Sequence, residues 1–139
     1  MLIGAYQHNI DSKGRVAIPA KFREDFGERF FVCKGLDRCL FVLSATEWTR
    51  MQDKMKALPI ASSAKLQRFY FAGAADVEPD KQGRILLPQH LRDYAGLDKD
   101  VTITGLSDRA EIWDTDSWNR YNEEQSDDDM MEAMRLLDF

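Results

Sequence analysis

Short apolar segments separated by turn-forming residues run through the first 118 positions of the chain. Brief runs of β-branched and aromatic residues are typical of strands, whereas apolar residues three or four positions apart are typical of helices. This pattern predicts strands at residues 5–10, 16–18, 30–34, 39–43, 74–78, 85–87, 101–104 and 110–113. It also predicts two short helices, which begin near Pro19 and Pro88 and end at Gly27 and Gly96.

The pattern of strands and helices occurs twice. A shift of 69 residues aligns residues 4–27 with residues 73–96 without a gap. The identities fall on Gly4, Ala5, Asp11, Gly14, Arg15, Pro19, Arg23 and Gly27 and on the residues 69 positions later. Chance similarity does not account for so many glycine and proline matches. The chain is therefore predicted to contain two copies of one structural unit.

Each copy has an Asp-x-x-Gly-Arg segment between its first two strands, at residues 11–15 and 80–84. The glycines of these segments, Gly14 and Gly83, suit the positive φ of a tight turn. The aspartate that begins each segment is well placed to accept hydrogen bonds from the backbone ahead of it. The two segments therefore predict two bends of the same geometry.

Two further helices are predicted between the copies. Residues 44–47 form a capping-box pattern, which leads into a stripe of Trp and Met residues that Pro59 ends. The second helix is expected to be capped by Ser62 or Ser63 and to end at Gly73. The apolar spacing of both helices favours packing on the strands or on a neighbouring subunit over binding a ligand.

Two half-structures of short strands cannot bury their faces separately, and pairing them removes exposed edges. The predicted fold is mainly β with accessory helices, in the form of one closed β-barrel with internal pseudo-twofold symmetry built from two tandem repeats. The expected regions are repeat 1 at residues 5–48, a helical connector at 49–72, repeat 2 at 73–118 and an acidic C-terminal tail at 119–139.

The formal net charge is −5, and the tail accounts for all of it, because residues 119–139 carry seven acids and two bases. Residues 1–118 are neutral and can still carry a local basic patch. Within the tail, an apolar stripe is formed by Met130, Met131, Met134 and Leu137. Two interpretations stay open: a solvated tail, or a helix that binds a partner or docks on the protein itself.

The composition argues against several classes of protein. No apolar run approaches the roughly 18 residues of a membrane span, and no export signal is recognised at the start, so we expect a cytoplasmic protein. The two cysteines, Cys33 and Cys39, are expected to be reduced and buried. They form no ligand pattern with His8 or His90, so we identify no metal site, cofactor or catalytic residue.

Residues 12–23 and 81–92 are basic stretches without an acid, and each includes most of a predicted bend. Arginine can bind phosphate or the edge of guanine through two hydrogen bonds, whereas lysine is better suited to phosphate alone. The candidate DNA-binding residues are Asp11, Lys13, Arg15, Lys21, Arg23, Asp80, Lys81 and Arg84, with Gly14 and Gly83 as turn glycines. The aspartates are expected to orient the arginines four positions on. The alternative is that these pairs only hold the turns.

Residues 11–19 and 80–88 resemble the AbrB-like swapped-hairpin superfamily. The two copies in one chain, Gly73-Ala74 before the second copy, residues 94–97 within it and residues 111–114 near its end are closer to one branch, the MraZ family. The resemblance covers nearly all of residues 1–118 and implies a double-psi barrel equivalent to a fused AbrB-type dimer.

The resemblance also implies a function. MraZ proteins are transcription regulators that form rings, often octameric, and bind direct repeats of double-stranded DNA in the promoter of the cell-division and cell-wall gene cluster that contains their own gene. Such a protein would be associated with the nucleoid. Their DNA-contacting Asp-x-x-x-Arg motif corresponds here to Asp11…Arg15 and Asp80…Arg84. Whether the two motifs bind equally is left open.

Two rival functions are less well supported. An enzyme with a symmetric aspartate dyad is disfavoured, because each aspartate has basic neighbours and no hydroxyl-glycine sequence follows it. An antitoxin-like or scaffold module is the other alternative. Antitoxins of this superfamily usually have one repeat and a long tail, whereas this chain has two repeats and a tail of 21 residues.

Overall fold

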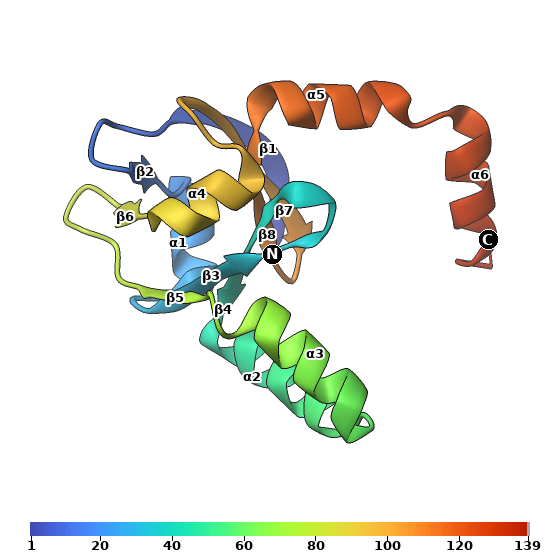
Figure 1. Ribbon diagram of the computed structural model, residues 1–139. Coiled ribbons are helices and arrows are strands. Elements are labelled where there is room, and N and C mark those ends of the chain that lie inside the picture. Colours follow the sequence, from blue (N-terminus) through green and yellow to red (C-terminus); the bar gives the residue numbers. More distant parts are fainter. Residues whose placement is uncertain (139) are drawn as a thin grey trace.

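The computed structural model describes residues 1–138. Its elements follow one another twice in nearly the same order, as the repeat predicts. In chain order they are β1 (Leu2–Asn9), β2 (Arg15–Ala17), α1 (Ala20–Phe26), β3 (Phe30–Lys34), the 3-10 turn η1 (Leu36–Arg38), β4 (Leu40–Ser44), α2 (Ala45–Lys56), α3 (Ile60–Tyr70), β5 (Ala75–Val77), β6 (Arg84–Leu86), α4 (Gln89–Ala95), β7 (Asp100–Ser107), β8 (Ala110–Asp114), α5 (Thr115–Glu124) and α6 (Asp127–Arg135). Figure 1 shows their arrangement.

The two repeats exchange their first strands. The main sheet has six antiparallel strands in the order β1-β7-β8-β4-β3-β5, so that β1 of the first repeat pairs with β7 of the second, and β5 of the second pairs with β3 of the first. At the centre, β4 and β8 pair with Phe41 opposite Glu111. A separate two-stranded ribbon pairs β2 with β6, with Val16 opposite Ile85. The strand order is symmetric about the β4–β8 pair.

The prediction of a closed barrel is not confirmed. Among residues 1–138, the strands form an open six-stranded sheet, with β1 and β5 at its edges, and the separate β2–β6 ribbon. β2 and β6, of three residues each, form a ladder only with each other. The structure therefore supports the coarser expectation, a mainly antiparallel sheet with accessory helices, and the double-psi barrel topology is left unconfirmed.

The main core lies between the ribbon and one face of the sheet. Val16 and Ile85 of the ribbon join Val32 and Ile103 of the sheet in one cluster of fully buried side chains. Successive residues of a strand point to opposite faces of the sheet. In β4, Leu40 and Val42 therefore lie in this core, and Phe41 and Leu43 lie on the other face.

The second face of the sheet carries a smaller aromatic cluster. Phe41, Leu43 and Trp113 pack there against residues of α2, α3 and α5, including Trp48 and Trp118. The ring of Trp113 lies 5.4 Å from that of Trp118. The accessory helices are thus held on the face opposite to the ribbon.

Several predicted helix ends are confirmed, and both ends of α3 are corrected. α3 ends at Tyr70, three residues before the predicted Gly73. The hydroxyl of Ser44 caps α2 by accepting from the backbone N–H of Glu47 at 3.3 Å, and Gly27 and Gly96 follow the last residues of α1 and α4. The prediction that Ser62 or Ser63 caps the next helix is wrong. α3 begins earlier, at Ile60 after Pro59, because proline has the φ of a helix start and needs no donor there.

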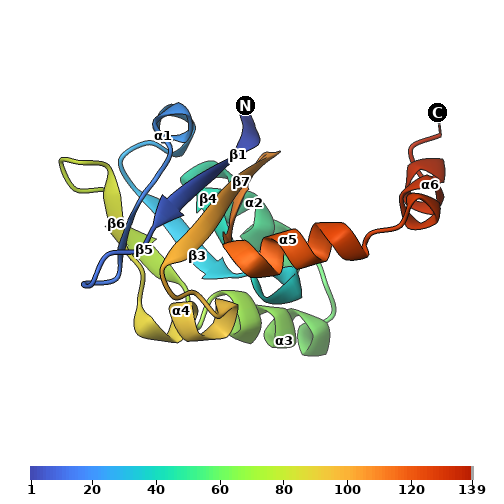
Figure 2. The same cartoon turned by 90° about the horizontal axis from the view of Figure 1, so that it is seen from above.

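The C-terminal segment extends away from the rest of the molecule. α5 lies against the second face of the sheet, and α6 stands beyond the far end of α5, clear of the body in both views (Figures 1 and 2). None of the described helices has the length and apolar character needed to cross a bilayer.

Candidate nucleic-acid interface

The first bend is held by a single carboxylate. Oδ1 of Asp11 accepts hydrogen bonds from the backbone N–H groups of Lys13 and Arg15, both at 2.9 Å, and Oδ2 accepts from Nε of Arg15 at 2.8 Å. The chain turns at Gly14, which has a φ of +83° and donates its N–H to the carbonyl of Asp11 at 3.0 Å. The predicted bend and the predicted orientation of the arginine by the aspartate are both present.

The second bend repeats this geometry. Oδ1 of Asp80 accepts from the backbone N–H groups of Gln82 and Arg84 at 2.9 Å, and Oδ2 accepts from Nε of Arg84 at 2.9 Å. Gly83 has a φ of +76°. Because both segments form the same hydrogen bonds, the bend is a property of the Asp-x-x-Gly-Arg sequence itself.

The two arginines lie on one face of the ribbon. Val16 and Ile85 point into the core, so their neighbours point outward, and in the ladder Arg15 is opposite Leu86 while Ala17 is opposite Arg84. The arginines are therefore diagonal neighbours on the outer surface. Each keeps about a third of its side-chain surface exposed, 31% for Arg15 and 30% for Arg84. Neither is tucked into the core.

The bends themselves project on the same side of the molecule, at the two ends of the ribbon (Figures 1 and 2). The backbone N–H of Leu87 donates to Gly14, and that of Ile18 donates to Gly83, both at 2.9 Å. Each bend is thus tied to the end of the strand that belongs to the other repeat. Lys13 and Lys81 are exposed at the tips.

The two aspartates remain ionised at neutral pH. Hydrogen bonding to the backbone N–H of Arg15 is the main cause that lowers the pKa of Asp11, and Arg84 has the same effect on the pKa of Asp80. Each carboxylate offsets part of the charge of its arginine. The unpaired positive charge of the bends therefore sits mainly on the two lysines, while the arginines are held in fixed orientations.

Lys21 and Arg23 lie outside the ribbon, on the short helix α1. Lys21 is exposed. Arg23 is engaged within the protein: its Nε donates to the carbonyl of Ile18 at 3.1 Å and its Nη2 donates to that of Gln82 at 3.4 Å. Its guanidinium also lies against Gly83 of the other repeat. Arg23 thus braces the second bend.

Sequence analysis did not select Arg92, the counterpart of Arg23. Nε of Arg92 donates to the carbonyl of Leu87 at 3.0 Å, and a Cβ placed on Gly14 would lie 2.9 Å from its Cζ. The 69-residue shift that pairs Arg23 with Arg92 was a usable signal for this role. Leu86 is also absent from the candidate residues, and its side chain is 58% exposed beside the arginines. The sequence of so short a strand does not indicate which of its two faces is exposed to solvent.

This surface suits a polyanion better than a small substrate. It combines fixed guanidinium groups, exposed lysines and an exposed apolar side chain on a narrow two-stranded ribbon, and ribbons of this kind fit the DNA major groove. Among the described residues, no group of three or more His, Cys, Asp or Glu side chains is arranged to hold a metal ion. Cys33 and Cys39 are buried free thiols, as expected.

Comparison with known proteins identifies the family of this chain. The family described as "MraZ protein, putative antitoxin-like" matches residues 1–68 and 70–139, so that each match contains one of the two predicted repeats. A protein named transcriptional regulator MraZ from Acetivibrio thermocellus is 52% identical, with 99% of both chains covered. Proteins of the same name from Heliobacterium modesticaldum, 50% identical over 100% of this chain and 99% of the relative, and from Desulforamulus reducens, 54% identical over 88% and 87%, are also similar.

Proposed function

This chain belongs to the MraZ family, and we propose that it regulates transcription by binding double-stranded DNA with the β2–β6 ribbon and its two bends. The observation that carries the proposal is the pair of arginines, Arg15 and Arg84, held by aspartates on one outward face. A guanidinium fixed in this way loses little freedom when it forms two hydrogen bonds to a guanine edge or a phosphate.

We assign different roles to the other candidate residues. Lys13, Lys81 and Lys21 are exposed and supply phosphate contacts. Asp11 and Asp80 orient the arginines and do not attract DNA themselves. Arg23 acts mainly by supporting the second bend, because two of its nitrogens already donate to backbone carbonyls. Gly14 and Gly83 permit the bends.

A single subunit offers few contacts. If it neutralises about three phosphates, its affinity falls with salt with a logarithmic slope of only about −3. We therefore propose that the protein acts as a homo-oligomeric ring, octameric as in its family, in which several ribbons bind one DNA molecule and increase avidity. Such a ring fits direct repeats that lie about one helical turn apart on the DNA. We expect these repeats in the promoter of its own cell-division and cell-wall gene cluster. A protein with this function would act in the cytoplasm, at the nucleoid.

The decisive test is fluorescence anisotropy with a duplex from upstream of the protein's own gene. We expect Arg15→Ala to weaken binding at least tenfold. Arg68→Ala, which removes an exposed arginine of α3 outside the ribbon, serves as the matched control and should bind as the wild type does. Equal binding by the wild type and by Arg15→Ala would refute the site. No binding by the wild type, together with co-purification of a second protein, would favour the antitoxin-like alternative.

A further inference from the structure

The C-terminal helix α6 has an apolar face with nothing packed on it. Met130, Met131 and Met134 are between 45% and 56% exposed, and Leu137 is 66% exposed. Spacings of three, four and seven residues place these side chains on one side of the helix. An apolar stripe of this size on a helix that stands clear of the body is unusual for a solvated tail.

α6 is nevertheless well formed. The hydroxyl of Ser126 accepts from the backbone N–H of Asp129 at 3.1 Å, and the carboxylate of Asp129 accepts in return from the backbone of Ser126, which completes a capping box. Acidic side chains in the first turn also interact favourably with the helix dipole. Because the helix is formed before any partner is present, binding through its apolar face costs less ordering entropy.

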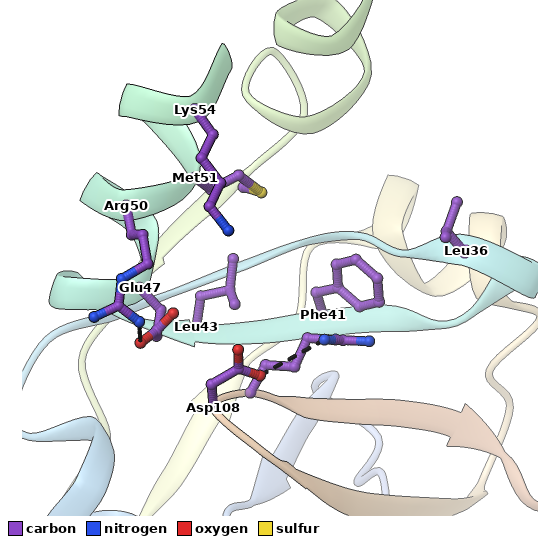
Figure 3. Close-up of a pocket in the computed structure, with 9 residues that line it drawn as sticks. Leu36, Phe41, Leu43, Glu47, Arg50, Met51, Lys54 and Asp108 are labelled. Atoms are coloured by element: carbon purple, nitrogen blue, oxygen red, sulfur yellow. Dashed lines mark hydrogen bonds and ion pairs between the residues drawn. The ribbon is translucent and has the colours of Figure 1, made fainter. Parts of the chain in front are cut away.

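A groove of complementary character lies on the second face of the sheet. It is an open cavity of about 350 Å³ between α2 and β4, floored by Phe41 and Leu43, with Leu36 at one end and Met51 above (Figure 3). Leu36 is 61% exposed. Apolar clefts of this volume are typical of sites that accept apolar side chains.

The rim of the groove is basic, whereas α6 is acidic. Arg50, Lys54 and Arg109 line the groove. Arg50 is paired with Glu47 and Arg109 approaches Asp108 at 3.6 Å, but within residues 1–138 no acidic partner lies in ion-pair range of the exposed Lys54. α6 carries four acids, Asp127, Asp128, Asp129 and Glu132, and one base, Arg135. Opposite charges would thus meet around an apolar contact.

The joint between α5 and α6 directs α6 away from its own groove. It consists of Gln125 and Ser126, and two extended residues span at most about 7 Å. α6 must therefore stay near the far end of α5, which is anchored on the sheet through Trp118 and Tyr121. The groove lies beside α2, and its residues Phe41 and Arg109 also border Trp118 near the start of α5, the end away from α6.

We propose that α6 of one subunit docks into the α2–β4 groove of a second copy of this chain, which in turn offers its own α6 to the next. This is a head-to-tail contact, and such contacts close into rings or continue as filaments. The inference rests on the oligomeric ring proposed above and names the surfaces that build it. One helix of nine residues is a small interface, so a single contact is weak and closure of the assembly supplies the avidity.

The test compares the mass of full-length variants in solution. Met130→Glu/Met134→Glu changes the docking face, and Leu136→Glu is the matched control, because Leu136 is 89% exposed and lies on the opposite side of α6. In sedimentation velocity at about 20 µM, we expect the wild type and Leu136→Glu to form the same oligomer and the double variant to sediment as a smaller species. An unchanged oligomer in the double variant would overturn the proposal and leave the ring and the DNA-binding site intact. A monomeric wild type would overturn the ring as well.

A mixing experiment separates docking between subunits from docking within one. Leu36→Glu/Lys54→Glu damages the groove and keeps the helix, whereas the helix variant keeps the groove. Because a single contact is weak, the mixture is examined at about 1 mM of each variant. If docking occurs between subunits, it then forms one-to-one complexes of twice the 16.0 kDa chain mass, although neither variant assembles alone. If the mixture stays monomeric, the groove of a second copy is not the binding site of α6. Each variant is also assayed for DNA binding at a single site, which the proposal predicts to be retained.

Discussion

Nη1 of Arg84 lies 3.7 Å from Oδ2 of Asp11, so the arginine of the second bend reaches the aspartate of the first. Asp11 therefore faces two guanidinium groups, its own Arg15 and the Arg84 of the other repeat. Within residues 1–138, no corresponding ion pair joins Arg15 to Asp80. The two motifs form the same local hydrogen bonds, yet the charges of the ribbon are centred on Asp11. This asymmetry leads to different expectations for the two aspartates.

Asp11→Asn should reduce discrimination between DNA sequences more than it reduces attraction to DNA. The amide oxygen can still accept from the backbone of Lys13 and Arg15, so the bend is kept. Arg15 then loses its charged partner, and Arg84 loses the second of its two and keeps Asp80. A bidentate contact to a base is worth about 1–3 kcal/mol of discrimination. We expect specific binding to fall about tenfold in anisotropy titrations, while binding to random duplex does not fall. Asp80→Asn is the comparison and should have a smaller effect; equal losses on both duplexes would contradict the orienting role.

The two kinds of basic residue at the first bend should be separable by their salt dependence. Arg15→Lys keeps the positive charge and loses the planar pair of N–H donors that can form two hydrogen bonds at once. We therefore expect weaker specific binding, with an unchanged dependence of the affinity on salt concentration. Lys13→Ala removes an exposed phosphate contact, so the slope should become shallower by about 1 and binding should weaken on all sequences alike. Titrations from low to physiological salt measure both effects. A sequence-dependent loss with Lys13→Ala would reverse these assignments.

The local parts of the site were predictable because their geometry depends on adjacent residues. The Asp-x-x-Gly-Arg segments form their hydrogen bonds within five positions, and Gly14 and Gly83 supply the positive φ that the bends require. Pro19 and Pro88 precede helices for an equally local reason. The repeat of 69 residues extended the same inference to the second copy.

The parts that depend on contacts between distant residues were harder to predict. The exchange of β1 and β5 between the repeats is determined by strand pairing, which no local pattern specifies. The closed barrel was expected because strand edges need to be covered. The sequence did not indicate that β2 and β6 pair as a separate ribbon, since this pairing also joins distant residues. Arg23 was grouped with the DNA contacts because it lies in the basic stretch of residues 12–23. Its hydrogen bond to Gln82 joins positions 59 residues apart, which no local pattern indicates.

The bracing of the bends predicts an added cost for a methyl group at Gly83. A Cβ there would collide with the guanidinium of Arg23, in addition to the strain of a positive φ. Gly96 is the matched control, because it has a φ of +63° and open space around its Cβ position. We expect Gly96→Ala to cost about 1–2 kcal/mol of unfolding free energy in urea, and Gly83→Ala to cost more. Adding Arg23→Ala to Gly83→Ala should recover part of the lost unfolding free energy. Equal losses for Gly83→Ala and Gly96→Ala would show that the Arg23 side chain moves aside without cost.

Leu86 offers a test of direct base reading. Its side chain is 58% exposed on the proposed DNA face, opposite Arg15 in the ladder. An exposed apolar side chain on such a ribbon can contact the methyl group of thymine. We expect Leu86→Ala to weaken specific binding about fourfold, near the value of one buried methylene. Duplexes with uracil in place of thymine should weaken the wild type by a similar factor and leave Leu86→Ala unchanged. Leu58→Ala, at the turn after α2, is the control, and identical uracil sensitivity in all three proteins would exclude the contact.

The depressed pKa values of the bend aspartates predict how stability changes in acid. Hydrogen bonding to the backbone N–H groups of Arg15 and Arg84 holds the pKa of Asp11 and that of Asp80 below the ordinary value of 3.8. A carboxyl whose pKa is lower in the folded protein stabilises the fold above its ordinary pKa, and this contribution is lost as pH falls through the lowered value. Both groups are solvent-exposed, so the contribution is modest.

Asp11→Asn/Asp80→Asn removes this titration and should flatten the acid side of the stability profile. We expect the urea midpoint of the wild type to fall between pH 5 and pH 2.5 by more than that of the double variant, so that the two curves approach each other in acid. The measurement is equilibrium unfolding by tryptophan fluorescence at constant ionic strength, because Trp48, Trp113 and Trp118 lie on the second face of the sheet, away from the substitutions. Parallel profiles would mean that the two carboxyls titrate alike in the folded and unfolded chain, contrary to the hydrogen bonds that hold the bends.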